Sequence, residues 1–340
     1  MKKLLNTLYV TQPNSYIYKD GMNVVISVDQ KEVFRIPVIN LEGIVSFSYS
    51  GCSPGIMKLC TDNKVSLTFL TPQGKFISRI QGPPTGNVLV RRKQFLITEN
   101  NETSLEIAKL IIAAKIKNYR TILQRYSRDY PSSELLQEAI LRLRQSQRNA
   151  LDATDKGTLR GVEGMAASIY FSVLPELIIQ QRNEFTFNGR NKRPPKDPVN
   201  AMLSFTYTIL GNEIASALEC AGLDPYVGVF HTLRPGRISL ALDLLEEFRA
   251  YLCDRFVISL INRRQIGIQH FKYQGEQGIH MTDECRKILL TAWQNRKKEL
   301  ILHPYINEKI PIGLLPYVQA LLLARKIRGE ASDYVPFIIK

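Results

Sequence analysis

The spacing of apolar residues changes once along this chain of 340 residues. Up to about residue 85, short runs of β-branched and aromatic residues alternate with polar ones, which is typical of strands with one buried face. From about residue 103, apolar residues recur every three or four positions, as they do on the buried side of a helix. The sequence therefore predicts an α+β fold, with a small N-terminal β-rich domain followed by a larger all-α-helical C-terminal domain.

Local signals place the expected elements. Strands are predicted in six runs: LLNTLYVT, NVVISV, EVFRIPV, GIVSFSY, VSLTFL and KFISRI. Turn signals separate the runs, among them Lys19-Asp20-Gly21. Ser53 followed by Pro54 predicts the cap and the first residue of a short helix over residues 54–62. Further helix starts are predicted by the same reasoning at Ser132 or Ser133, at Asp155, and at Asp197-Pro198.

The best candidate for a domain boundary is the stretch Gly82-Pro83-Pro84-Thr85-Gly86, because glycine and proline interrupt regular structure. We expect residues 1–86 to form the β-rich domain, which we assign to packing and self-association. Residues 87–102 are expected to be a linker, and residues 103–340 the helical domain.

The chain is strongly basic, with 45 Lys and Arg against 31 Asp and Glu, a net charge of +14. Such an excess indicates a polyanionic partner, nucleic acid first and an anionic membrane surface second, although a merely basic soluble protein is an alternative. The basic residues that could follow a phosphate backbone, or simply face solvent, are Arg142, Arg144 and Arg148 on one helix and Arg190, Lys192, Arg193 and Lys196 in one loop.

The five cysteines form no CxxC pair, which favours reduced thiols in a cytoplasmic protein over a zinc site or a disulfide framework. The N-terminal residues do not resemble a signal peptide, and no apolar run is long enough to span a bilayer. The sequence thus predicts a cytoplasmic protein that does not enter a membrane.

An acidic helix is predicted within HTLRPGRISLALDLLEEFR, residues 231–249, and is expected to continue beyond Arg249 through YLCDRFVISLIN. Asp243, Glu246 and Glu247 lie three and four positions apart, so their carboxylates can converge and would repel one another without a cation. His231 precedes them in a loop rich in proline and glycine. A loop histidine is more often a hydrogen-bonding residue than a metal ligand, but the carboxylates just downstream favour half of a metal site. The other three histidines, at positions 270, 280 and 303, show no such grouping.

A second acidic candidate is Glu163, on the partly apolar face of the helix predicted after Asp155. Gly161 and Gly164 flank it, and each glycine within a helix costs roughly 1 kcal/mol relative to alanine. A close approach to the backbone, for instance by a sugar–phosphate chain, would explain them. The alternative is a glutamate paired with a neighbouring arginine such as Arg160.

Four segments together carry a resemblance to a known family: LRGVEGMAASIYF, KDPVNAMLSFTYTIL, DPYVGVFH and GRISLALDLLEEFR. With them the chain resembles the CRISPR-associated integrases of spacer acquisition, which are also described as metal-dependent DNA endonucleases. The resemblance extends over the whole chain and looks close to the variant found with type I-C CRISPR systems. It implies an N-terminal β domain that dimerises and a helical domain that holds the metal.

The resemblance also implies the site. Glu163, His231 and Glu246 match the metal ligands, and Asp243 matches a further acidic position near the metal. Glu247 is expected farther from the ion or in solvent. One imidazole with carboxylates suits Mg²⁺ or Mn²⁺. The implied partners are double-stranded DNA (the prespacer and the CRISPR repeat), a second copy in a homodimer, and a small ferredoxin-like companion protein.

The expected reaction is an attack by the 3′-hydroxyl of the incoming fragment on a phosphodiester of the repeat, with hydrolysis when water takes its place. Two other classes remain. A non-catalytic DNA-binding or architectural protein shares the basic charge but does not explain the acidic cluster. A helical di-metal carboxylate oxidoreductase would carry two Glu-x-x-His pairs, and no glutamate here precedes a histidine by three residues.

Overall fold

The computed structural model describes residues 6–72, 74–82, 88–129, 133–191, 194–275 and 278–339. The chain forms two compact units. The first comprises Met1–Thr85, Met281–Ile301 and Ile310–Leu314, and the second Gly86–His280, Leu302–Lys309 and Leu315–Lys340. The first unit therefore includes late segments that the sequence analysis expected in the helical domain. Residues 83–86 of the expected boundary lie outside the described residues.

Two sheets form the first unit. One has the strand order β1-β5-β6-β7, in which β1, β5 and β6 run parallel and β7 antiparallel; the other is the antiparallel sheet β2-β3-β4. The strands of this unit are β1 Thr7–Val10, β2 Ser15–Asp20, β3 Asn23–Val28, β4 Lys31–Pro37, β5 Gly43–Ser46, β6 Ser66–Leu70 and β7 Phe76–Ile80. A 3-10 turn, η1 Val38–Asn40, follows β4.

Each of the six predicted strand runs overlaps one of these strands, and the prediction missed only β2 among them. β2 pairs with β3 along its whole length through the turn at Gly21, whose φ is +57°. Asp20-Gly21 between two alternating runs is a hairpin signal. Reading the turn together with the residues on both of its sides would have revealed the strand.

The helix α1, Pro54–Asp62, begins and ends where the sequence predicts. The side chain of Ser53 accepts a hydrogen bond from the backbone N–H of Ile56, which satisfies a donor left open at the first turn. Ile56 and Leu59 of α1 pack into one apolar core with Ile17 from one sheet and Ile44 from the other. The first unit thus buries a face of each sheet against the same helix. It also contains α9, Asp283–Lys298.

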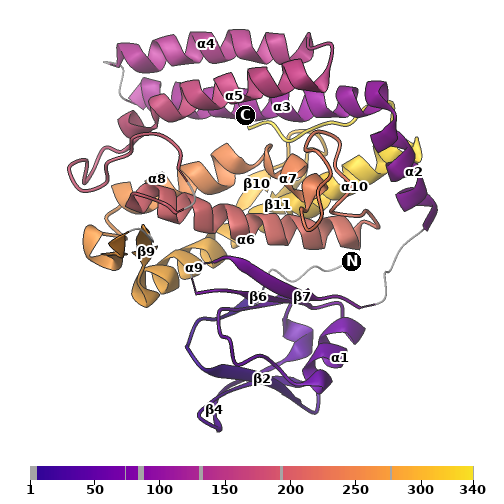
Figure 1. The fold of residues 1–340 in the computed structure, drawn as a ribbon, viewed down its shortest axis with the longest axis vertical. Coiled ribbons are helices and arrows are strands. Elements are labelled where there is room, and N and C mark those ends of the chain that lie inside the picture. Colours follow the sequence, from indigo (N-terminus) through magenta and orange to yellow (C-terminus); the bar gives the residue numbers. More distant parts are fainter. Residues whose placement is uncertain are drawn as a thin grey trace. The chain divides into compact units, whose positions relative to one another are not determined.

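The second unit is mainly helical (Figure 1). Its helices are α2 Val88–Glu99, α3 Asn101–Asp129, α4 Glu134–Leu151, α5 Lys156–Ser172, α6 Pro198–Cys220, α7 Ser239–Leu245, α8 Arg255–Asn262 and α10 Leu315–Arg328. Short 3-10 or π segments of this unit are η2 Leu174–Leu177, η3 Arg249–Asp254 and η4 Ile268–His270, whereas η6 Ile312–Leu314 belongs to the first unit. In Figure 1, α3, α4 and α5 lie side by side, and α6 packs with α7 and α10.

Three of the predicted helix caps are confirmed. Ser133, Asp155 and Asp197 each accept a hydrogen bond from a backbone N–H of the first turn of α4, α5 and α6, respectively. Ser132 lies outside the described residues. The segment expected as a linker contains α2.

Two expectations about the C-terminal region are wrong. This region is not all-helical, because it contains four short strands: β8 Phe271–Tyr273, β9 Ile279–Met281, β10 Leu300–Leu302 and β11 Lys309–Pro311. Pro304, and Asn307 with its φ of +55°, form a turn between β10 and β11 that no helix could continue through. The acidic helix was also expected to continue past Arg249 as one helix, and it ends instead at Leu245.

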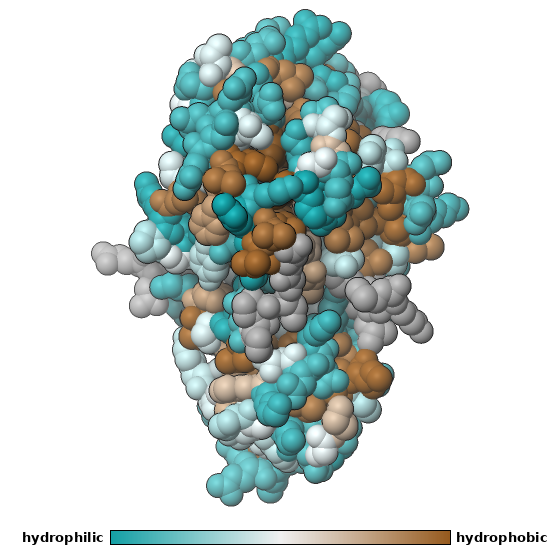
Figure 2. Space-filling model, turned by 90° about the vertical axis from the view of Figure 1, so that its right-hand side faces the viewer, coloured by the Kyte–Doolittle hydropathy of each residue, from teal (hydrophilic) through white to brown (hydrophobic). Residues whose placement is uncertain are grey.

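None of the helices within the described residues combines the length and the apolar character that a membrane crossing requires. Figure 2 shows one face of the molecule, on which hydrophilic side chains surround smaller apolar patches.

Candidate metal centre

The acidic segment changes its backbone conformation where its carboxylates lie. α7 ends at Leu245, residues 246–248 form a turn, and the π-helix η3 begins at Arg249. Single π-type turns within helices are frequent at functional sites. The change turns the side chains of Glu246 and Glu247 toward different partners, so the expected convergence of Asp243, Glu246 and Glu247 on one point is wrong.

Asp243 organises the loop that carries His231. Its two carboxylate oxygens accept backbone N–H bonds from Val229 at 2.6 Å, Phe230 at 3.1 Å and His231 at 2.9 Å. Gly228 lets the loop come this close, since a Cβ there would lie 2.7 Å from Asp243 Oδ2. Asp243 is fully buried, and these bonds fix the backbone at the histidine.

Asp243 also fixes the imidazole. His231 Nδ1 lies 2.6 Å from Asp243 Oδ1, so Nδ1 carries the proton when the ring is neutral and Nε2 offers its lone pair. Nε2 lies 4.0 Å from Glu246 Oε1. A carboxylate behind a histidine in this way is the usual support of a metal-ligating imidazole. The geometry suits His231 as a ligand and Asp243 as the residue that orients it.

Glu246 is buried among cations. Its Oε1 lies 3.0 Å from Arg249 Nη2 and its Oε2 lies 2.7 Å from Lys115 Nζ. Burial alone would raise the pKa of Glu246, but Arg249, Lys115 and His231 outweigh it and lower the pKa to about 2. Glu246 is therefore a carboxylate anion at neutral pH. The contact with Lys115 is not aligned as a hydrogen bond, and Oε2 has no other donor in the described part of the chain.

Glu163 reaches the same place from α5. Its Oε1 forms an ion pair with Lys115 Nζ, and its side chain is 21% exposed, so it lies at the edge of the site. The alternative that paired Glu163 with Arg160 is not what the structure shows, since the Arg160 guanidinium lies over the ring of Phe230. A Cβ added at Gly161 or Gly164 would have no described atom within 4 Å, so these two positions, on the outer face of α5, are open.

The structure thus brings Glu163, His231 and Glu246 near one another. The ammonium group of Lys115 contacts both glutamates, and His231 Nε2 lies 4.0 Å from Glu246 Oε1. Among the described residues, no three His, Cys, Asp or Glu side chains close on one point as a ready metal site. Lys115 Nζ lies instead between the two glutamates. The donor set still fits a divalent ion. It offers the carboxylates of Glu163 and Glu246, and Glu246 is an anion whose Oε2 lacks a hydrogen bond in the described part of the chain. It also offers Nε2 of His231, whose other ring nitrogen is held by Asp243.

A polar layer lies behind Glu246. The guanidinium of Arg249 stacks over Tyr207, whose hydroxyl donates to Asp254 Oδ1 at 2.5 Å. Burial raises the pKa of Asp254 to about 6, although the bond from Tyr207 and the charge of Arg249 act in the opposite direction. Arg190 lies over the other side of this cluster, 5.3 Å from the Tyr207 ring centre. These contacts hold Arg249 against Glu246.

Arg190 was expected in a loop that clamps a nucleic-acid backbone. Its guanidinium instead donates to the side chains of Asn200 and Ser204, so it fastens the loop to α6. Lys192 and Arg193 of that loop lie outside the described residues.

Glu247 has a different role from the one expected. It is fully buried and accepts hydrogen bonds from Tyr334 Oη at 2.6 Å, the backbone N–H of Phe337 at 2.8 Å and Gln319 Nε2 at 3.0 Å. The side-chain NH₂ group of Asn118 donates to the backbone carbonyls of Glu247 and Phe337, and its oxygen accepts the backbone N–H of Ile339. Glu247 therefore fastens the C-terminal segment to the acidic turn, and it faces neither solvent nor the candidate metal position.

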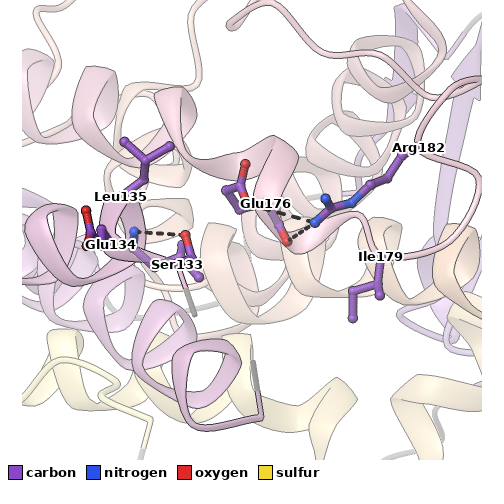
Figure 3. Close-up of a pocket in the computed structure, with 7 residues that line it drawn as sticks. Ser133, Glu134, Leu135, Glu176, Ile179 and Arg182 are labelled. Atoms are coloured by element: carbon purple, nitrogen blue, oxygen red, sulfur yellow. Dashed lines mark hydrogen bonds and ion pairs between the residues drawn. The ribbon is translucent and has the colours of Figure 1, made fainter. Parts of the chain in front are cut away.

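A cavity of about 520 Å³ lies elsewhere in this unit, beside the start of α4 (Figure 3). Its lining comprises Ser133, Glu134, Leu135, Leu136, Glu176, Ile179 and Arg182. Ser133 caps α4, and Arg182 donates to the backbone of residues 176 and 178. This lining is bonded within the chain and includes none of the predicted site residues.

Sequence reasoning missed two cations of the site. Arg249 lies three positions after Glu246, a spacing that places the two on one helix face, and this signal was available. Lys115 lies within the apolar stripe of α3, three positions after Ile112 and four before Tyr119. A lysine on a buried helix face needs a partner, which is also a readable signal, although it does not say which carboxylate is the partner.

Comparisons with known proteins give the chain a family. The family model described as CRISPR associated protein Cas1 matches residues 8–295. A CRISPR-associated endonuclease Cas1 of Chlorobaculum tepidum is 47% identical over 341 residues, which cover 99% of each chain. Two solved structures share the fold, each with a TM-score of 0.83 and 22% identity. One is a casposase bound to integration product, matched over 97% of this chain and 93% of that one; the other is a Cas6-RT-Cas1–Cas2 complex, matched over 98% of this chain and 36% of that one.

Proposed function

The chain belongs to the Cas1 family of CRISPR-associated proteins, and we propose that Glu163, His231 and Glu246 form its catalytic metal site. The protein is a Cas1 endonuclease and integrase of CRISPR adaptation. The observation that carries the proposal is that Glu163 and Glu246, from separate segments, both contact Lys115 Nζ, and that the oriented imidazole of His231 has its Nε2 4.0 Å from Glu246 Oε1.

Mg²⁺ or Mn²⁺ is the ion that this donor set suits. When bound, such an ion stabilises negative charge on the reacting phosphate and helps to activate the attacking oxygen. Glu163 and Glu246 would hold it with His231 Nε2. Asp243 keeps the imidazole in the tautomer that leaves Nε2 unprotonated.

The reaction proposed for this site is a transesterification. The 3′-oxygen of a DNA fragment attacks a phosphorus of the CRISPR repeat, a new P–O bond forms, and the bond to the repeat's own 3′-oxygen breaks. That leaving oxygen takes a proton and becomes a hydroxyl. Water as the attacking group gives strand cleavage instead. Lys115 and Arg249 add fixed positive charge where the phosphate gains negative charge.

The substrate in this proposal is double-stranded DNA, both the prespacer and the repeat. The net charge of +14 supports it. So does a basic cluster in which Arg144 and Arg148 of α4 lie near Arg120 of α3, close enough that burial and these two charges lower the pKa of Arg120. Binding through such residues weakens as salt concentration rises.

We further propose that the protein acts as a homodimer with a small ferredoxin-like companion, and that it belongs to the type I-C variant. The similarity in fold to a chain of a Cas1–Cas2 complex supports the companion, and the four sequence segments described above support the subtype. A protein with this role would work in the cytoplasm, where the array DNA lies.

The test is an integration assay with a prespacer duplex, a plasmid carrying a repeat, the companion protein and Mg²⁺ or Mn²⁺. Glu163→Gln and His231→Ala should each reduce integration by at least about 100-fold, because each removes a ligand. Glu138→Gln, an exposed glutamate on α4, is the control and should integrate normally. Binding of duplex DNA, measured without a divalent ion, should be unchanged in all three variants. Normal integration by either ligand variant would remove these residues from the mechanism, and integration in excess chelator would favour a non-catalytic DNA-binding role.

A further inference from the structure

The two glutamates of the candidate site already hold a cation that belongs to the protein. Lys115 Nζ is paired with Glu163 Oε1 and lies 2.7 Å from Glu246 Oε2, and its side chain is 1% exposed. A lysine side chain is ordinarily protonated at neutral pH, and two carboxylates in contact with it favour the charged form. A charged ammonium group therefore occupies the place between two carboxylates that also suits a divalent ion.

The charges of the two glutamates are balanced without any metal. Glu163 and Glu246 carry two negative charges, and Lys115 and Arg249 carry two positive ones. A divalent ion added to this buried group leaves an excess of positive charge, and Lys115 loses partners that an enclosed ammonium needs. Metal binding should therefore be weak until another anion joins the site.

An anion can reach the site from solvent. Glu163 and His231 are 21% and 18% exposed, so neither side chain is fully covered by the rest of the chain. A backbone phosphate of DNA could lie against these two side chains. It would give Lys115 a new partner and free the glutamates for the metal.

We propose that Lys115 couples metal binding to DNA binding: its ammonium competes with the divalent ion for Glu163 and Glu246 until a DNA phosphate takes the ammonium as its partner. This inference rests on the proposed metal site. It makes the two affinities reciprocal, so that DNA strengthens metal binding by the same factor by which the metal strengthens DNA binding. A protein of this design would hold little metal while it has no DNA.

The test measures the dissociation constant of Mn²⁺ for the full chain by electron paramagnetic resonance of free Mn²⁺, with and without a DNA duplex. Glu163→Gln with the same duplex corrects for Mn²⁺ bound by DNA alone. In the wild type, DNA should strengthen Mn²⁺ binding at least tenfold. In Lys115→Met, Mn²⁺ should bind more tightly without DNA, and the effect of DNA should fall below threefold. Lys109→Met, on the same helix but outside the site, should behave as the wild type.

Two results would overturn the coupling: a wild type whose Mn²⁺ affinity does not respond to DNA, or a folded Lys115→Met with the wild-type affinity and response. If Lys115→Met does not melt cooperatively in Mn²⁺, Lys115→Gln replaces it, and the wild-type measurement remains decisive. The proposed metal site is tested separately by His231→Ala. If that variant binds Mn²⁺ as the wild type does, the site itself is wrong; if it binds weakly while Lys115→Met changes nothing, only the coupling is wrong.

Discussion

His231 Nδ1 lies 2.6 Å from Asp243 Oδ1, and the same carboxylate accepts the backbone N–H of His231. One residue therefore holds both the loop and the ring, and leaves only Nε2 directed at Glu246. The orientation of the candidate ligand thus depends on a buried residue that need not touch the metal.

Asp243→Asn should weaken metal binding. An amide offers one acceptor where the carboxylate offers two, and its NH₂ group faces the backbone N–H groups of the loop. Changes of such supporting residues cost about 10- to 100-fold in metal affinity. The dissociation constant of Mn²⁺ measures the effect, with circular dichroism as a check on folding. A folded Asp243→Asn with unchanged affinity would contradict this role.

Gly228→Ala should destabilise the protein. The new Cβ would lie 2.7 Å from Asp243 Oδ2 and 2.8 Å from Ser239 Cβ, both buried, so the loop must move. We expect a loss of about 1–3 kcal/mol in the free energy of unfolding, as for other overpacked sites, and weaker Mn²⁺ binding. Gly161→Ala is the matched control, because its Cβ would meet open space. Equal melting temperatures for the two variants would count against the prediction.

Removing residues 334–340 should impair the site from a distance. Glu247 would lose the bonds from Tyr334 and Phe337 and be left as a buried carboxyl group with a single donor. An unsatisfied buried group costs about 1–3 kcal/mol, and integration should fall because the neighbouring residue is Glu246. Tyr334→Phe should show a smaller effect in melting and integration assays. Tyr305→Phe, at an exposed tyrosine, should show none.

Asp254 should make stability depend on pH. Its pKa is raised from 3.8 to about 6 in the folded protein, so between these values the folded state keeps a proton that the unfolded state has lost. The stabilisation that Asp254 gives to the folded state is fully present below about pH 4. It is lost as the pH rises through about 6, and the free energy of unfolding stays lower above that pH. The loss is up to about 3 kcal/mol.

Asp254→Asn cannot ionise, so its melting temperature relative to the wild type should rise between pH 4.5 and pH 7. Asp333→Asn, at an exposed aspartate, should show no such change. A constant difference between Asp254→Asn and the wild type across this range would contradict the raised pKa.

Local patterns in the sequence predicted much of the fold. Four helix starts could be predicted because a capping side chain bonds to a backbone N–H only two or three positions ahead, so the whole signal is local in the sequence. The capping residues are Ser53, Ser133, Asp155 and Asp197. The strand β2 was missed although its turn was recognised, and the acidic helix was extended too far. Its break at Glu246 has no glycine or proline to announce it.

The candidate site was only partly predictable. His231 and the acidic residues lie within one short segment, so the sequence could suggest them. The pairing of Lys115 with Glu163 joins positions 48 apart, and that of Glu247 with Tyr334 joins positions 87 apart. Such contacts depend on how helices pack, which apolar spacing alone does not specify.

The bonds to Glu247 also make the acidic turn depend on the segment that holds it. Tyr334 and Phe337 bond to the residue that follows Glu246. Local opening of that segment should therefore disturb the turn before the rest of the unit unfolds.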